Sequence, residues 1–211
     1  MGFYFTKEEI REALVRRHSA RLQEKLERAR VAVAGLGGLG SHAAVFLART
    51  GVGHLHLIDF DAVDITNLNR QHYSARHIGI FKTDALAEQL REINPYLDIR
   101  TDRIKVTEEN IPRLFGEEDI ICEAFDCPEA KATLACGIRE YFPEKYLVAA
   151  SGMAGYGDSN RIRTRQIGPR FYLCGDGISE VKEGSGLMAP RVAVCAAHEA
   201  NLILQLIAEN L

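Results

Sequence analysis

The sequence lacks the features that mark zinc-binding, nucleic-acid-binding and membrane proteins. Its five cysteines form no CxxC pair, which excludes a four-thiolate zinc site of the usual spacing. A net charge of -3 provides no basic footprint for nucleic acid or an anionic membrane. No uninterrupted apolar run approaches the roughly 18 residues of a membrane-spanning helix, and the charged amino-terminal residues contain no signal-peptide core. We therefore expect a cytoplasmic protein without zinc, nucleic acid or membrane partners.

The length and composition are those of a soluble globular protein. The 211 residues suffice for about one domain with a substantial core, and 26% charged with 46% hydrophobic residues excludes a disordered chain. Strands alternate with helices through residue 151, which predicts an α/β fold with a doubly wound, mainly parallel Rossmann-like sheet over residues 30–151. A helix over residues 7–28 precedes the sheet. Residues 152–211 add short strands and a helix to the same single domain.

The expected strands place the functional residues of the domain at one edge. Apolar runs predict strands at residues 31–34, 54–58, 97–101, 119–125, 146–150, 161–166 and 171–174. Amphipathic helices follow Lys82 and Pro128, and a last helix spans residues 191–211. Because right-handed crossovers connect parallel strands, the carboxyl ends of these strands share one edge of the sheet. Ligands of such sheets bind along that edge.

A glycine turn follows the first strand. Its pattern, GLGGLG, contains Gly35, Gly37, Gly38 and Gly40. Glycines at these positions allow the backbone to approach a ligand and the next helix to pack near the strand. The helix that begins in the turn offers free N–H groups to an anion. The pattern alone is weak evidence, but the preceding strand and the following helix agree with it and predict a nucleotide site.

Asp59 ends the second predicted strand. It lies 24 residues after Gly35, close to the interval of about 20 residues for the acid that accepts hydrogen bonds from ribose hydroxyls. We therefore expect Asp59 to bind the ribose of the nucleotide. Asp61 is either a second ligand or a cap of the loop, and the sequence does not separate these two interpretations.

The polar segment NLNRQ at residues 67–71 favours a more highly charged ligand than a nicotinamide cofactor. Asn67, Arg70 and Gln71 are its candidate ligands, and an arginine holds phosphate oxygens in a bidentate fork. Lys82 begins the next helix, where a cation is unfavourable to the helix dipole. Each cation taken singly is commonly a surface charge. Together behind a glycine turn, they indicate a triphosphate.

Asp126 closes the fourth predicted strand at the ligand-binding edge. A carboxylate beside a triphosphate is a natural Mg²⁺ ligand, because Mg²⁺ takes one or two carboxylates together with phosphate oxygens and water. Glu129 either assists Asp126 or stabilises the first turn of the following helix. We therefore expect Arg70, Lys82 and Asp126 to converge on a bound triphosphate.

These residues in this order resemble the ubiquitin-activating-enzyme-like adenylyltransferases, the ThiF, MoeB and HesA group. The resemblance covers residues 10–150 and rests on GLGGLG, DFD, NLNRQ, the lysine after a glycine and the aspartate at a strand end. It implies binding of ATP and Mg²⁺ and adenylation of the carboxyl terminus of a small ubiquitin-fold sulfur carrier protein. The products of that reaction are an acyl-adenylate and pyrophosphate.

The resemblance also implies a role for each residue of the motif. Asp59 holds the ribose, Gln71 lines the site, Asp126 binds the metal, and Asn67, Arg70 and Lys82 hold the phosphates. The family is dimeric, and an arginine from the amino-terminal helix of one subunit reaches the nucleotide of the other. Arg17 is the candidate for this arginine, with Arg16 and Arg21 as competitors.

The chain departs from many members of the group by lacking their two zinc-binding CxxC pairs. Its tail, YLCGDGISEVKEGSGLMAP, instead resembles the compact members that act in thiamine biosynthesis. Cys174 lies in this glycine-rich segment, and some relatives form a thioester or persulfide through a loop cysteine. Cys174 is therefore a candidate for a covalent role. The alternative is a partly buried thiol at a strand end.

Three alternatives remain open. The same fold activates other carboxylates, such as the molybdopterin carrier or a modified tRNA base, and the net charge does not favour tRNA. An NAD-dependent oxidoreductase would need no Mg²⁺, and the sequence offers no acid or base for hydride transfer. A nucleotide-binding scaffold without activity has no reason to keep Arg70, Lys82 and Asp126.

Overall fold

Seven strands form one sheet in the computed structural model, which describes residues 5–211. Their order is β3-β2-β1-β4-β5-β7-β6, and all neighbouring pairs are parallel except β6 and β7. The strands are β1 (Arg30–Ala34), β2 (His54–Ile58), β3 (Asp98–Asp102), β4 (Ile120–Glu123), β5 (Tyr146–Ala150), β6 (Arg163–Gly168) and β7 (Phe171–Gly175). The predicted α/β, mainly parallel Rossmann-like sheet is confirmed, and the two late strands extend it at one side.

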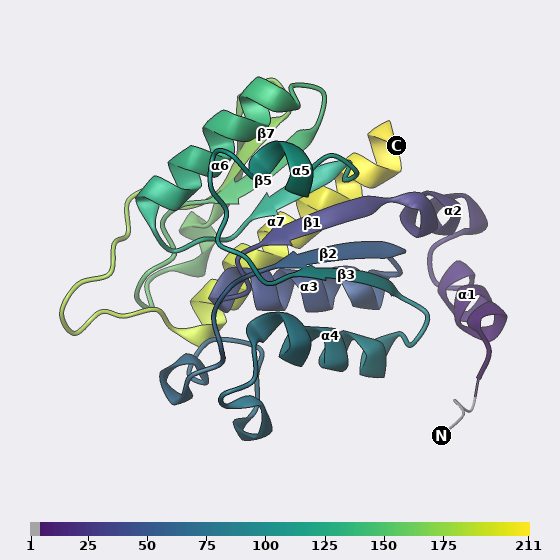
Figure 1. Ribbon diagram of the computed structural model, residues 1–211, viewed down its shortest axis with the longest axis horizontal. Coiled ribbons are helices and arrows are strands. Elements are labelled where there is room, and N and C mark those ends of the chain that lie inside the picture. Colours follow the sequence, from purple (N-terminus) through teal and green to yellow (C-terminus); the bar gives the residue numbers. More distant parts are fainter. Residues whose placement is uncertain (1–4) are drawn as a thin grey trace.

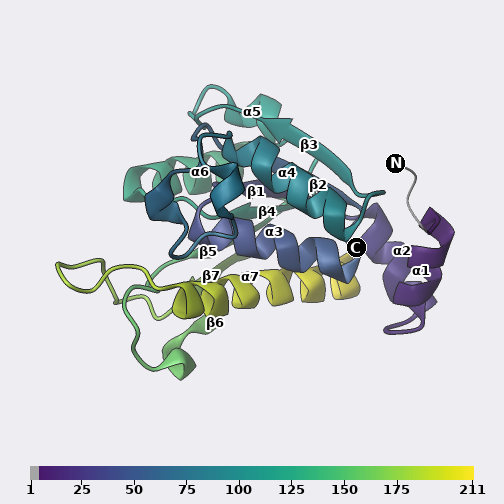
Figure 2. The ribbon, with the colours of Figure 1, turned by 90° about the horizontal axis from the view of Figure 1, so that it is seen from below.

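Helices cover both faces of the sheet. They are α1 (Lys7–Val15), α2 (Ala20–Arg28), α3 (Gly38–Thr50), α4 (Lys82–Ile93), α5 (Ile111–Leu114), α6 (Pro128–Tyr141) and α7 (Ala189–Asn210). One core lies between the sheet and α3, α4 and α7, and a second core lies between the sheet and α5 and α6 (Figures 1 and 2). The central strands β4 and β5 are buried along their whole length, as parallel strands covered on both faces must be.

The amino-terminal helix is broken, contrary to the prediction of one helix over residues 7–28. Thr6 begins α1 with a capping box to Glu9. Ser19 then begins α2, because its Oγ accepts a hydrogen bond from the Leu22 N–H at 3.2 Å. A serine that can satisfy a free N–H group favours a helix start over a helix interior. Both helices lie at the amino-terminal end of β1 (Figure 1).

Helix α7 begins two residues before the predicted start at residue 191 and packs against α3 and the sheet. By length and composition it is apolar enough to cross a membrane, although no uninterrupted apolar run marks it in the sequence. Half of its most apolar window is buried inside the structure. In this fold α7 serves as a core helix, and Figure 2 shows it running beside α3.

The carboxyl ends of the parallel strands meet at one edge. The glycine turn after β1, Asp59 after β2, residues 124–127 after β4 and the loops after β5 and β7 all lie there. The fourth strand is shorter than predicted, since β4 ends at Glu123. Asp126 therefore belongs to the loop between β4 and α6 rather than to a strand end.

Candidate nucleotide-binding site

The glycine turn has the backbone geometry that its sequence predicts. Gly35 adopts a φ of 91°, and its N–H donates to the Ile58 carbonyl at 2.9 Å. A Cβ atom on Gly35 would lie 2.8 Å from the Ala124 carbonyl oxygen, and one on Gly40 would lie 1.8 Å from the Gly35 carbonyl oxygen. Only glycine fits at these two positions, so the turn is fixed between β2, β4 and the first turn of α3.

The start of α3 is open to an anion. Gly37 is the N-cap residue and provides no side-chain hydrogen bond to the first N–H groups. Those groups and the positive end of the helix dipole can therefore act on a ligand. This is the arrangement in which helices of nucleotide-binding folds hold phosphates.

Asp59 is hydrogen-bonded to the glycine turn. Its carboxylate accepts hydrogen bonds from the Leu36 N–H at 2.7 Å and from the Asp61 N–H at 2.8 Å. The side chain is almost buried, with 8% relative exposure. Burial raises the pKa of the Asp59 carboxyl, and the Lys82 ammonium opposes that shift. Each oxygen keeps a lone pair, so Asp59 can still accept from a ribose hydroxyl.

Arg70 and Gln71 lie against the glycine turn, as predicted. Arg70 Cγ would be 3.6 Å from a Cβ on Gly38, and Gln71 Nε2 would be 3.7 Å from one on Gly37. The guanidinium donates through Nη1 to the Thr66 carbonyl and the Asn69 side chain, while its Nε is buried without a partner among residues 5–211. Gln71 Oε1 is also buried without a partner. Both atoms can therefore still form a hydrogen bond with a ligand.

Asn67 holds the loop that carries Arg70. Its Oδ1 accepts from the Asp64 N–H at 3.1 Å in a capping box of the short 3-10 helix Ile65–Asn67. This contact fixes the direction in which the chain enters Arg70 and Gln71. The structure thus gives Asn67 a part in shaping the loop, and its predicted contact with a phosphate stays a prediction.

Lys82 is buried rather than a surface cation. Its ammonium donates to Asp61 Oδ2 at 2.8 Å and lies 3.9 Å from Asp59 Oδ2. Only 6% of the residue is exposed. Two carboxylates therefore offset the unfavourable position of a lysine at the start of α4. They also connect Lys82 to the turn that holds Asp59.

Asp126 is exposed in the loop after β4. Its neighbour Phe125 lies against Gly35, where a Cβ would be 2.9 Å from Phe125 Cδ1. Among residues 5–211, no group of three or more metal-binding side chains gathers at one point. A single carboxylate beside phosphates still fits Mg²⁺, because phosphate oxygens and water supply its other ligands.

A comparison with known protein families shows the family of the chain. The sequence pattern of the ThiF family matches residues 10–210. The chain belongs to the ThiF family. The match extends over the whole sheet, the glycine turn and α7.

Several curated proteins are similar to this ThiF-family chain. The adenylyltransferase and sulfurtransferase uba4 of Aspergillus terreus is 44% identical over 111 residues, which cover 52% of the chain and 23% of uba4. UBA4 of Eremothecium gossypii is 37% identical over 156 residues, which cover 72% of the chain and 34% of UBA4. The chain spans less than two fifths of the length of these relatives.

Solved structures share the fold. The tRNA N6-threonylcarbamoyladenosine dehydratase TcdA of E. coli, in complex with ATP, matches with a TM-score of 0.86 over 97% of both chains at 24% identity. E. coli MccB with ATP matches with a TM-score of 0.68 over 90% of this chain and 59% of MccB at 26% identity. At 24% identity the TcdA likeness shows the fold alone.

Two predicted residues of the ThiF-family chain lie away from the glycine turn. Cys174 belongs to β7 rather than to a loop and is fully buried. Burial raises the pKa of its thiol to about 12, which makes the thiolate scarce at neutral pH. Cys174 therefore matches the alternative of a buried thiol at a strand end rather than a cysteine in a loop, because β7 continues to Gly175. Arg17 is exposed between α1 and α2, at the opposite end of β1 from the glycine turn (Figure 1).

Sequence reasoning missed two groups that hold the site. The Tyr73 hydroxyl donates to the Leu36 carbonyl within the glycine turn at 2.8 Å. Glu123, at the end of β4, accepts from the Lys131 ammonium at 3.0 Å, and Lys131 also donates to the Ala150 carbonyl at the end of β5. A tyrosine two residues after the NLNRQ segment was the one available signal. The Glu123–Lys131 ion pair joins residues eight positions apart across a loop, and no sequence pattern indicated it.

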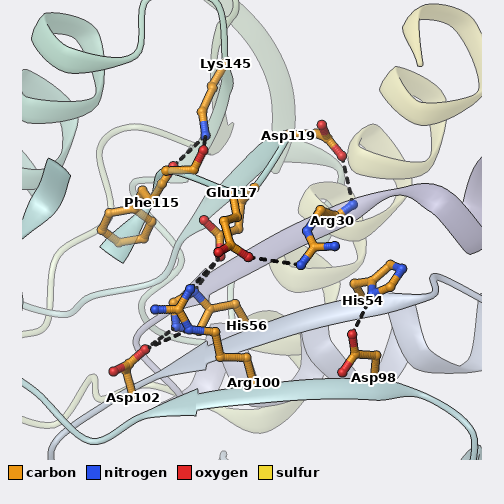
Figure 3. Close-up of polar contacts among 12 residues, drawn as sticks. Arg30, His54, His56, Asp98, Arg100, Asp102, Phe115, Glu117, Asp119 and Lys145 are labelled. Atoms are coloured by element: carbon orange, nitrogen blue, oxygen red, sulfur yellow. Dashed lines mark hydrogen bonds and ion pairs between the residues drawn. The ribbon is translucent and has the colours of Figure 1, made fainter. Parts of the chain in front are cut away.

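A second polar cluster joins β2, β3 and the segment before β4. His56 is buried, and its ring nitrogens lie 2.7 Å from Glu118 Oε1 and 2.8 Å from Asp102 Oδ2. Figure 3 shows His56, Arg100 and Asp102 pointing toward one another. The contact with His56 lowers the pKa of Glu118, although burial opposes this. These contacts tie the segment before β4 to the outer strands, and the cluster contains none of the residues predicted for the nucleotide site.

Proposed function

We propose that this protein adenylates the carboxyl-terminal carboxylate of a small ubiquitin-fold sulfur carrier protein, using ATP and Mg²⁺ in the cytoplasm. The carrier that we propose is the one of thiamine biosynthesis. Membership of the ThiF family and the resemblance of the tail to compact members support this proposal. The relatives named as adenylyltransferases agree with the reaction type.

One observation carries the proposal. Arg70 lies against Gly38, the first residue of α3, and its buried Nε has no partner in the part of the chain that the structure describes. A guanidinium at the phosphate end of a helix supplies charge that a nicotinamide cofactor does not need, because its pyrophosphate is already held by the turn. The arrangement suits an ATP whose phosphates must be aligned and neutralised.

The chemistry needs no nucleophile from the protein. A carboxylate oxygen of the carrier attacks the α-phosphorus of ATP, an oxygen–phosphorus bond forms, and the bond from the α-phosphorus to the bridging oxygen of pyrophosphate breaks. The carrier becomes an acyl-adenylate and pyrophosphate leaves. The protein contributes by holding the reactants in line and by stabilising the charge that develops on the phosphates.

In this proposal each residue acts on a defined part of ATP. Asp59 accepts from the ribose hydroxyls, and Asn67, Arg70 and Lys82 hold phosphate oxygens while Gln71 lines the site. Asp126 would bind Mg²⁺, which neutralises phosphate charge when bound. Lys82 must exchange its contact with Asp61 for a phosphate or share it between the two.

We further propose that the active form is a homodimer in which Arg17 serves the nucleotide of the second copy. The support is the position of Arg17, which excludes contact with the glycine turn of its own chain. Arg16 and Arg21 lie in the same region and remain competitors for this role.

Carrier-dependent exchange of pyrophosphate into ATP tests the proposal. We expect exchange with the thiamine carrier, and none with the same carrier whose terminal carboxylate has been amidated. The same assay with a molybdopterin carrier, and with a modified tRNA, tests the alternative substrates that proteins of this fold activate. Exchange with either of these alone would contradict the thiamine assignment. Calorimetric binding of NAD in preference to ATP–Mg²⁺ would contradict adenylation altogether.

A further inference from the structure

A buried ion pair lies beside the proposed adenylation site. Arg191, in the first turn of α7, donates through Nη2 to Asp176 Oδ2 at 2.7 Å. The two side chains are 5% and 4% exposed. Arg191, like Lys82, is a cation in the first turn of a helix, where the dipole disfavours it. Its position therefore calls for an explanation other than the stability of α7.

Arg191 and Asp176 bind the two loops that leave the carboxyl ends of β5 and β7. We call residues 151–158 and 176–188 the rim loops. Arg191 Nη1 donates to the carbonyls of Gly157 and Asp158 in the first rim loop, at 2.9 and 2.8 Å. Asp176 Oδ1 accepts from the N–H groups of Ile178 and Ser179 in the second. One ion pair thus fixes both loops, and the pKa of Asp176 is lowered to about 2 by these hydrogen bonds against the effect of burial.

The rim loops are also joined to each other through their backbones. The Asp176 N–H donates to the Gly152 carbonyl at 2.9 Å, and the Gly155 N–H donates to the Gly186 carbonyl at 2.9 Å. A Cβ on Gly152 would lie 2.2 Å from Asp176 Oδ1, so the first rim loop packs directly on the carboxylate. The loops form one unit with the ion pair inside it.

This unit borders the glycine turn. The Asn69 side chain, beside Arg70, donates to the Leu187 carbonyl of the second rim loop at 3.2 Å. Val192, next to Arg191 in α7, approaches Gly38 so closely that a Cβ there would be 2.9 Å from Val192 Cγ1. The rim loops therefore continue the wall of the nucleotide site along the sheet edge.

We propose that Asp176 and Arg191 are positioning residues that hold the rim loops where the carboxyl-terminal tail of the acyl substrate docks beside the phosphates. The proposal rests on the proposed adenylation function. An extended tail is bound mainly through backbone groups, and the glycine-rich rim loops present such groups at the edge. Neither residue is among those that we assign to ATP, so we expect the affinity for nucleotide not to depend on the pair.

Three variants test the proposal. Asp176→Asn keeps the shape and removes the charge, and Arg191→Lys keeps the charge but cannot reach Asp176 and both carbonyls at once. The double variant Asp176→Leu with Arg191→Met replaces the pair by apolar groups, which commonly preserves stability. The exposed pair Arg28–Glu24, at 2.6 Å in α2, provides the matched control as Glu24→Gln.

We expect the KM for the carrier to rise on the order of 10- to 100-fold in each variant. The affinity for ATP should remain within about twofold of the wild-type value, as befits residues that touch no nucleotide. Hydrogen–deuterium exchange should quicken in residues 151–158 and 176–188 and stay unchanged in β1 and β4. Glu24→Gln should leave all three measurements at wild-type values.

The outcomes separate this proposal from the proposed function. Wild-type protein without any exchange activity would contradict adenylation, and deuterium exchange would still show whether the pair holds the loops. Active wild-type protein together with an unchanged KM for the carrier in a folded double variant would overturn the positioning role. Unchanged deuterium exchange in the rim loops of that variant would overturn it as well. If Asp176→Asn does not fold, the same measurements on Arg191→Lys and on the double variant test the positioning role.

Discussion

The Lys82 ammonium lies 2.8 Å from Asp61 Oδ2 and 3.9 Å from Asp59 Oδ2. The cation that was predicted to hold a phosphate is thus held by two acids, one of which is predicted to hold the ribose. This relationship gives Lys82 a structural role beside its proposed role in phosphate binding. Its substitution should affect both properties.

Lys82→Ala should lower the free energy of unfolding by roughly 1–3 kcal/mol, because it leaves a nearly buried Asp59 without its neighbouring cation. Urea unfolding measures this change. Adenylation should fall as well, since a phosphate contact is lost. Asp61→Asn provides the control. Because half of the Asp61 side chain is exposed, this substitution should lower the free energy of unfolding by less than Lys82→Ala does. A fully stable, fully active Lys82→Ala protein would contradict both parts of the prediction.

Arg70→Ala should reduce pyrophosphate exchange on the order of 10²- to 10³-fold, the typical effect of removing one positioned donor at a reacting centre. The thermal midpoint should change little, because the guanidinium makes no ion pair within residues 5–211 and donates its hydrogen bonds to its own loop. Arg76→Ala is the matched control from the same loop region, where the arginine pairs with Glu92 on the surface. Wild-type exchange in Arg70→Ala would refute the phosphate assignment.

Stability should fall as pH rises because of Glu199. This residue is fully buried in α7, and neither of its oxygens has a hydrogen-bond partner within the described residues 5–211. Burial raises the pKa of its carboxyl well above the ordinary 4.5. The folded protein keeps the proton where the unfolded chain has lost it, so raising the pH above about 4.5 favours unfolding.

Glu199→Gln removes this dependence. The variant should therefore gain stability relative to the wild type by about 1.4 kcal/mol per pH unit while the folded carboxyl stays protonated. Urea midpoints of both proteins between pH 5 and 8 measure the difference. Parallel curves for the two proteins would show that Glu199 is ionised in the fold.

Cys174 should be inert toward alkylating reagents in the native protein. The thiol is fully buried on β7, and burial raises its pKa to about 12. Iodoacetamide should instead modify Cys127 and Cys136, which are exposed. Peptide mass spectrometry identifies the labelled residues, and Cys174→Ala should retain pyrophosphate exchange. Rapid labelling of Cys174 without unfolding would reopen a covalent role.

The local part of the fold and site could be predicted from the sequence. The strand, glycine turn, helix and Asp59 are consecutive, so their geometry follows from periodicity and glycine spacing. The position of Arg70 at the turn was also predictable, because the carboxyl ends of β1 and β2 lie at the same edge of the sheet. These features depend on neighbours in sequence or on the handedness of the crossover.

Contacts between distant residues were not predictable in this way. Two examples are the ion pair of Arg191 with Asp176 and the hydrogen bond from Tyr73 to Leu36. Both depend on how loops pack against each other, and no local pattern of residues in the sequence indicates that packing. The break near Ser19 followed from a competition between helix continuation and capping, and residue spacing alone does not resolve it. The sequence left Cys174 open between a cysteine in a loop and a thiol at a strand end, and the pairing of β7 with β5 and β6 places it in the strand.

The placement of α1 and α2 has a consequence for how the protein behaves at low concentration. Five residues of β1 separate these helices from the glycine turn of their own chain, a span of about 16 Å. In the proposed homodimer, an arginine from this region would complete the nucleotide site of the other molecule. Specific activity that depends on Arg17 would therefore decline on dilution, and mixing Arg17→Ala with Arg70→Ala protein would restore part of it.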